Sequence, residues 1–226
     1  MQLEKVTTER QSEEKKRFDD ACGLAHAMEL LGERWAMLVL RELAYGPRRF
    51  SELKSDLQGI SANVLTQRLN ELEARGLIRK IRLPPPASVQ VYESTPWGLE
   101  AIPVIASLGR WAARSPLHNA ALRMCHVSVI MSFQTLLSPQ RSEGLEARVG
   151  FRFGDASYLT TVHDGRLDVE RRDPEGADVT FIGSPTDIAG VIHGGAPFDT
   201  IRVEGDLELA DRFRTLFPLP EKVAIG

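Results

Sequence analysis

The stretch between Gly59 and Ile78 constrains the fold of this chain more than any other. The apolar residues that recur in it at helical spacing are Leu65, Leu69 and Leu72. This period predicts a helix with one apolar face and one polar outer face. Ser61 is a suitable N-cap, and Gly76 followed by Leu77 is typical of a helix that ends at a glycine. We therefore predict an amphipathic helix from about residue 62 to residue 75.

The outer face of this predicted helix carries amides and hydroxyls, which can donate and accept hydrogen bonds at base edges in a DNA major groove. The candidate base-contacting residues are Ser61, Asn63, Thr66 and Gln67. Arg68 has two interpretations, a contact to DNA phosphate or an ion pair with Glu71 or Glu73. A helix that is merely solvated on its polar side would show the same pattern. The segments on either side of the helix distinguish the two interpretations.

The neighbouring segments favour a DNA-binding arrangement. Ser51 is expected to cap a short helix that reaches about Gln58, and a tight turn then leads into the amphipathic helix. After Gly76 the period changes to two, which predicts strands at 78–83 and 88–93 around a proline-rich tip. A hairpin in this place is the wing of a winged helix-turn-helix. The candidate phosphate contacts are Arg48, Arg49, Arg79, Lys80 and Arg82.

Charge is distributed unevenly along the chain. The formal net charge of the 226 residues is −3, yet the segment 34–82 holds ten Lys or Arg against five Asp or Glu. A local basic patch is sufficient for phosphate contact, so the overall charge does not exclude a nucleic-acid partner.

A further apolar stripe follows the predicted wing. Thr95 and Pro96 are typical of a helix start, and we expect one helix to about Arg114 with a kink at Pro103. The apolar positions along it are Trp97, Ala101, Val104, Leu108 and Trp111. The stripe is either core or a dimer seam, and the seam is favoured because one winged helix is too small to bury it.

The first half of the chain resembles the HxlR-type winged-helix transcription regulators, a MarR-like group. The matching residues are Cys22, Gly32, Arg34-Trp35, Leu40-Arg41-Glu42-Leu43, Gly46-Pro47-Arg48-Arg49-Phe50, Glu52-Leu53, Gly59-Ile60-Ser61, Leu65-Thr66-Gln67-Arg68-Leu69, Leu72-Glu73, Gly76-Leu77-Ile78, Tyr92, Thr95, Gly98 and Trp111. The resemblance implies a homodimer on double-stranded DNA, with a pseudopalindromic operator whose half-sites lie about one helical turn apart. Members of this group commonly stop near residue 115 of this numbering, whereas this chain continues.

The sequence of the second half predicts an α+β domain with an antiparallel sheet and flanking helices. Helices are expected at 120–137, 185–193 and from Asp206 through Phe213, and strands at 147–153, 158–163, 167–171, 179–182 and 201–204. Asp164-Gly165 is a strong hairpin signal. The predicted division is a charged segment 1–20, a winged helix-turn-helix at 21–115 and this domain at 120–222.

This second domain resembles a sterol carrier protein-like domain, which implies a pocket for an apolar ligand. The resemblance rests on Ala177-Asp178-Val179-Thr180, Gly183-Ser184-Pro185, Gly194-Gly195 and Val203-Glu204-Gly205-Asp206-Leu207. The pocket candidates are Phe133, Phe151, Phe153, Leu159 and Phe198. Apolar residues at such spacing are also consistent with a plain core.

The remaining reactive residues give little sign of catalysis. The five histidines form no metal-binding motif, and nucleophile elbows, phosphate-binding loops and CxxC pairs are missing from the sequence, so we expect no enzyme, metal or cofactor. Cys22 opens a predicted helix, where a stabilised thiolate would act as a redox sensor, as in some members of the resembled family. Its alternative role is that of a small buried apolar residue.

Together these patterns predict a dimeric, sequence-specific DNA-binding transcription regulator that an apolar small molecule modulates. With neither a signal peptide nor an apolar span of membrane length in the sequence, we expect a cytoplasmic protein without membrane contact. The alternative is a carrier of lipids or other hydrophobic ligands whose winged helix serves protein contact or dimerisation. The operator, the effector and the sign of regulation do not follow from the sequence.

Overall fold

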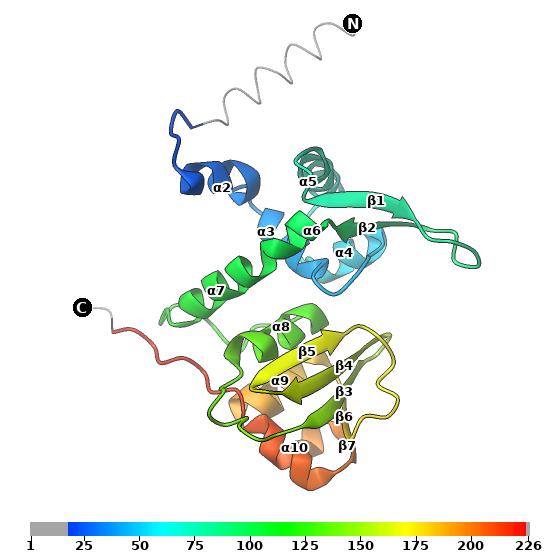
Figure 1. Cartoon of the computed structure of the whole chain (residues 1–226), viewed down its shortest axis with the longest axis vertical. Helices are drawn as coiled ribbons and strands as arrows, with labels where there is room; N and C mark the ends of the chain where they lie inside the picture. The colour runs from blue at the N-terminus through cyan, green and yellow to red at the C-terminus, as the bar shows by residue number, and fades with distance from the viewer. Residues whose placement is uncertain (1–17, 225–226) are drawn as a thin grey trace, which may run out of the picture. The chain divides into compact units, whose positions relative to one another are not determined.

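The structure, a computed structural model, describes residues 18–224 (Figure 1). Most of the predicted charged segment 1–20 lies outside these residues. Contacts divide the chain into two compact units. The first unit runs to Leu40 and then from Arg48 to Leu99, and the second comprises Arg41–Pro47 and the chain from Glu100 onward.

The first unit is a winged helix-turn-helix. Its elements are α2 (Gly23–Leu31), α3 (Ala36–Glu42, which ends in the second unit), α4 (Phe50–Asp56), α5 (Ala62–Ala74), β1 (Ile78–Arg82), β2 (Gln90–Ser94) and α6 (Pro96–Glu100). Apolar side chains from the helices and the hairpin form its core, among them Leu40, Leu53, Leu65, Leu69, Leu72, Ile78 and Val91. The predicted helix-turn-helix with its hairpin is confirmed.

Helix α5 begins and ends where its sequence predicts. The Ser61 hydroxyl accepts a hydrogen bond from the Val64 amide at 3.2 Å. At the other end, Gly76 has a φ of +74°. The amide of Gly76 donates to the Glu73 carbonyl at 2.9 Å, and the amide of Leu77 donates to the Leu72 carbonyl at 3.0 Å. These two hydrogen bonds satisfy the last carbonyls of the helix.

Helix α4 begins two residues earlier than its sequence suggested. The predicted N-cap, Ser51, lies inside the helix, which starts at Phe50. The Glu52 carboxylate instead accepts a hydrogen bond from the Arg49 amide at 2.6 Å. A carboxylate in the first helical turn satisfies an exposed amide and is favoured by the helix dipole, so it replaces the missing serine cap.

The hairpin β1–β2 is antiparallel, with Ile78 opposite Ser94 and Arg82 opposite Gln90. Arg48 joins it through an isolated backbone bridge to Tyr92, in which each amide donates to the other carbonyl at 2.8 Å. The residue that leads into α4 is therefore bound to the wing.

The single helix expected at 95–114 is wrong. The chain forms α6 and a separate helix α7 (Ile102–Ala113), because Pro103 has no amide to bond the carbonyl of Leu99. The break falls at Ala101, two residues before the proline.

The second unit places helices on one face of a five-stranded sheet. Its further elements are α8 (His126–Leu136), β3 (Ala147–Phe153), β4 (Ala156–His163), β5 (Arg166–Glu170), β6 (Val179–Ile182), α9 (Pro185–Gly194), η1 (Phe198–Thr200), β7 (Arg202–Gly205) and α10 (Leu207–Arg214). The strand order is β5-β4-β3-β6-β7. The expected antiparallel sheet is wrong in one pair, because β6 runs parallel to β3.

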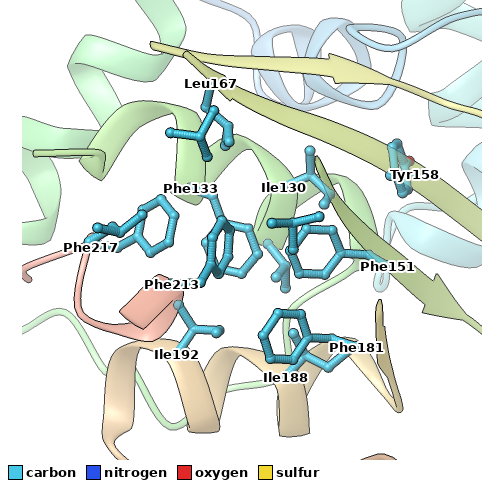
Figure 2. Packing of buried hydrophobic residues seen from close by; sticks show 14 of the residues in the cluster. Ile130, Phe133, Phe151, Tyr158, Leu167, Phe181, Ile188, Ile192, Phe213 and Phe217 are labelled. Atoms are coloured by element: carbon cyan, nitrogen blue, oxygen red, sulfur yellow. The ribbon is translucent and has the colours of Figure 1, made fainter. Parts of the chain in front are cut away.

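Aromatic rings fill the core between this sheet and the helices (Figure 2). Phe133 on α8 lies 5.3 Å from Phe151 on β3, and Phe151 lies 5.6 Å from Phe181 on β6, measured between ring centroids. Phe213 on α10 lies 4.8 Å from Phe217. Helix α8 starts at His126, six residues later than predicted, with the Cys125 thiol at its N-cap. Among the described residues, no helix is long and apolar enough to cross a membrane.

Candidate nucleic-acid interface

The polar face of α5 is open to solvent. Ser61, Asn63, Thr66 and Gln67 are all exposed. The Gln67 amide nitrogen donates to the Glu71 carboxylate at 3.0 Å, one turn along the same helix. The opposite face carries the buried leucines of the core. The arrangement leaves a row of uncharged donors and acceptors available to a partner.

Arg68 lies on the buried face of α5, and its side chain is only 5% exposed. Its guanidinium pairs with the Glu71 carboxylate and lies 3.5 Å from the Glu33 carboxylate. The expectation of a DNA contact is therefore corrected, and the ion-pair interpretation holds with Glu71 as the partner. The cause is helical geometry, because position 68 lies between Leu65 and Leu72 on the core-facing stripe.

Arg48 is also removed from the set of phosphate contacts. Its side chain is 3% exposed, and its Nη2 lies 2.5 Å from Oδ2 of Asp56. Its Nε lies 3.7 Å from the Glu52 carboxylate. Both carboxylates follow on α4, four and eight residues downstream, a spacing that could have signalled the pair. Arg49, by contrast, is exposed.

The wing presents its basic side chains on two faces. Lys80 and Arg82 share one face by strand alternation and, with Ile81, Ser88 and Gln90, line a shallow depression of about 400 Å³. The Lys80 ammonium lies 5.7 Å from the centroid of the Tyr92 ring. Arg79 is 62% exposed on the other face, and its Nε lies 2.5 Å from the Glu93 carboxylate.

The predicted apolar pocket is not assembled. Phe133, Phe151 and Phe153 lie in the packed aromatic core. Leu159 is buried, but strand alternation turns it to the opposite face of the sheet from its neighbours in the core. Phe198 is half-buried at η1, where the Arg214 guanidinium lies 5.0 Å from its ring centroid. The five residues therefore do not line one space.

The two cysteines have opposite environments. Cys22 is exposed at the N-cap of α2, and hydrogen bonds from the backbone of Leu24 and then of Ala25 lower the pKa of its thiol. It is therefore not the buried apolar residue of the alternative interpretation. Cys125 is half-buried, with its sulfur 3.2 Å from the Glu42 carboxylate, and burial raises the pKa of this thiol.

Several polar groups inside the second unit were missed by sequence reasoning. His126 Nδ1 lies 2.7 Å from the Tyr158 hydroxyl, and His193 Nε2 lies 2.8 Å from the Ser132 hydroxyl. Burial lowers the pKa of His193. These partners are separated by 32 and 61 residues, so no local spacing could have revealed them. In the part of the chain that the structure describes, no group of three or more metal-ligating side chains is present.

Comparison with known proteins assigns the first half of the chain. The profile of the HxlR-like helix-turn-helix family matches residues 30–118. The HTH-type transcriptional regulator YvaP of Bacillus subtilis is 33% identical over 86 residues, which cover 38% of this chain and 80% of YvaP. YkvN, a second HTH-type transcriptional regulator of that organism, is 40% identical over 92 residues, 40% of this chain and 77% of YkvN.

One similar solved structure is the reduced form of the transcriptional regulator YodB from B. subtilis. It is 30% identical, the match covers 43% of this chain and 97% of YodB, and the TM-score is 0.39. The extent and identity of the matches to YvaP and YkvN are sufficient to assign the family. The chain belongs to the HxlR-like helix-turn-helix transcriptional regulators.

Proposed function

We propose that this protein is a homodimeric regulator that reads a specific DNA sequence with the polar face of α5. The observation that carries the proposal is the exposure of Asn63, Thr66 and Gln67 on a helix that is followed directly by a basic hairpin. Asparagine and glutamine side chains can bond adenine bidentately in the major groove. Gln67 would exchange its bond to Glu71 for one to a base.

The proposed phosphate contacts are the exposed basic side chains of the first unit. These are Arg49, Arg79, Lys80 and Arg82. Phosphate contacts fix the register of a protein on the duplex, whereas base contacts select the sequence. Each phosphate contact should add about 0.9 to the slope of log affinity against log salt concentration.

The proposed dimer surface includes α7. Val104, Leu108 and Trp111 follow one another at helical spacing on this helix, and their side chains are 67%, 45% and 69% exposed. In the first unit, Leu24 and Met28 of α2 are likewise exposed. Large apolar side chains in contiguous exposed rows mark interaction sites, and a two-fold symmetric dimer would cover them. Such symmetry matches a pseudopalindromic operator.

We further propose that the second unit is a sterol carrier-like regulatory domain for an apolar small molecule. Its sheet, its flanking helices and its aromatic core support this role. Because Phe133, Phe151 and Phe213 contact one another, an effector among them would have to displace ring contacts. Mass spectrometry of small molecules released by denaturation tests the proposal, and an apo domain that binds no hydrophobic probe would oppose it.

The DNA-binding proposal is tested by selecting a preferred duplex and measuring fluorescence anisotropy over a range of salt concentrations. The double variant Asn63→Ala, Gln67→Ala should lose the preference for the selected duplex and keep salt-dependent binding to any duplex. Lys80→Ala with Arg82→Ala should weaken both kinds of binding and reduce the salt slope by about two. Gln140→Ala, an exposed change in the second unit, is the matched control.

Unchanged selectivity in the Asn63 and Gln67 variant would contradict the assignment of α5. Sedimentation of the full chain tests the dimer. The wild type should sediment as a dimer, and the variant Trp111→Asp should sediment as a monomer. Failure of the wild-type protein to retain any duplex at low salt would instead favour a carrier of hydrophobic ligands.

A further inference from the structure

The segment Arg41–Pro47, which we call the connector, packs with the second unit although it lies inside the family-matched region. It links α3 to α4, and the chain on both sides of it belongs to the first unit. The matches to YvaP and YkvN extend over 86 and 92 residues and cover 80% and 77% of those proteins. The connector thus lies inside the family-matched residues and packs with a unit that continues beyond them.

Tyr45 is the central contact of the connector. Its hydroxyl donates a hydrogen bond to Oε1 of Gln134 on α8 at 2.5 Å. Its ring meets the ring of Tyr158 on β4 edge to face, with the centroids 5.9 Å apart. The amide nitrogen of Gln134 donates to the Leu167 carbonyl at 3.0 Å, so both ends of this amide are bonded. Tyr45 is half-buried, so the hydrogen bond holds its polar end while its ring packs against Tyr158.

Both ends of the connector are held as well. Near its start, the buried carboxylate of Glu42 accepts a hydrogen bond from the Cys125 thiol at the N-terminus of α8, at 3.2 Å. At its end, Arg171 Nη1 donates to the Pro47 carbonyl at 3.4 Å. Gln134 and Cys125 of α8, together with Arg171 after β5, thus contact one short segment of the chain.

The residue that follows the connector belongs to the DNA-reading elements. Arg48 pairs its backbone with Tyr92 in β2 of the wing and its guanidinium with Asp56 at the end of α4. Covalent continuity from Pro47 to Arg48 therefore joins the connector to the wing and to the first helix of the helix-turn-helix.

We infer that Gln134 is a positioning residue for DNA recognition. It binds Tyr45 and so fixes the connector. Because Arg48 follows the connector directly, a fixed connector favours one conformation of Arg48, and with it of the β2 backbone and the α4 carboxylate that Arg48 binds. The inference rests on the proposed function. When the connector is released, the binding-competent arrangement is a smaller fraction of the population, and the apparent affinity falls by that fraction.

The test uses the full chain with Gln134→Leu. The substitution removes the hydrogen bonds of Gln134 to Tyr45 and to the Leu167 carbonyl, and loss of the bond to Tyr45 should weaken binding to the selected duplex about three- to tenfold. Gln140→Leu is the matched control, because it makes the same substitution at an exposed position of the second unit and should leave affinity unchanged. Tyr45→Phe removes only the hydroxyl and should weaken binding equally, and the double variant should be no weaker than either single variant.

Amide hydrogen exchange supplies a readout that does not depend on DNA. Gln134→Leu should speed exchange at Arg48 and Tyr92, whose amides form the bridge to the wing, while β3 and β4 keep their protection. Affinity and exchange equal to those of Gln140→Leu, or additive effects of the Tyr45 and Gln134 changes, would overturn the inference. If the wild type binds no duplex, the proposed function fails, and the exchange at Arg48 still decides on the connector.

Discussion

Gly98 is the position where one added methyl group should perturb the first unit most. A Cβ atom on this residue of α6 would lie 2.0 Å from the carbonyl oxygen of Leu77 and 3.0 Å from its carbonyl carbon. The same oxygen accepts hydrogen bonds from the Thr95 amide at 3.0 Å and the Thr95 hydroxyl at 3.2 Å. Gly98→Ala must therefore displace either α6 or the peptide group at the start of the wing.

The size of the effect follows from these contacts. Overpacking of this kind costs about 1–3 kcal/mol. The two hydrogen bonds to Leu77 contribute about 1 kcal/mol each, and alanine returns about 1 kcal/mol through its higher helix propensity. The expected loss in the free energy of unfolding is about 2–4 kcal/mol. With a urea dependence of about 2 kcal/mol per molar, the unfolding midpoint should fall by about 1–2 M.

The measurement is urea unfolding followed by tryptophan fluorescence in a Trp111→Phe background. Trp35 and Trp97 then report on the first unit alone. Gly190→Ala in α9 is the matched control, because a Cβ there meets nothing within 4 Å and the change should leave this signal unaltered. An unchanged midpoint for Gly98→Ala would refute the close approach of α6 to the wing.

Three further predictions concern charged and titrating groups. Arg48→Met should lower the free energy of unfolding of the first unit by about 1–3 kcal/mol, because it leaves a carboxylate without its buried partner. Arg49→Met should leave urea unfolding unchanged and reduce the salt slope of DNA binding by about one. Iodoacetamide should alkylate Cys22 before Cys125, and the pH at which the rate rises should be lower for Cys22, as followed by mass spectrometry of peptides; equal rates would contradict this. Burial lowers the pKa of His193, so the neutral imidazole contributes to the free energy of unfolding above about pH 6.5, and this contribution is lost as the pH falls towards the folded-state pKa. Urea unfolding of His193→Gln should therefore depend less on pH between 7.5 and about 5 than that of the wild type.

The elements that sequence reasoning placed well are those set by neighbouring residues. Strands β3 and β6 have the predicted bounds, and α5 ends within one residue of its prediction. The hairpin turn at Asp164 and Gly165 has the positive φ values that its sequence implied, +46° and +70°. Apolar period, caps and turn residues act over a few positions, so they can be read without the fold.

The candidate site was predicted less completely. Exposure of the polar face of α5 followed from its period. The sequence left Arg68 open between DNA phosphate and an ion pair, and it assigned Arg48 to phosphate because the carboxylates downstream on α4 were not considered. Both guanidinium groups face carboxylates and are buried. The pocket candidates failed for a related reason, since a shared apolar character does not say which face of a sheet each residue occupies.

The sequence by itself determined the winged helix-turn-helix, its polar recognition helix and the alternation of strands and helices in the second half. Only the tertiary structure decided that β6 runs parallel to β3 and that the connector packs with the second unit. The bond between Tyr45 and Gln134 joins residues 89 positions apart. Such pairings depend on which distant surfaces the folded chain brings together, and local spacing carries no information about them.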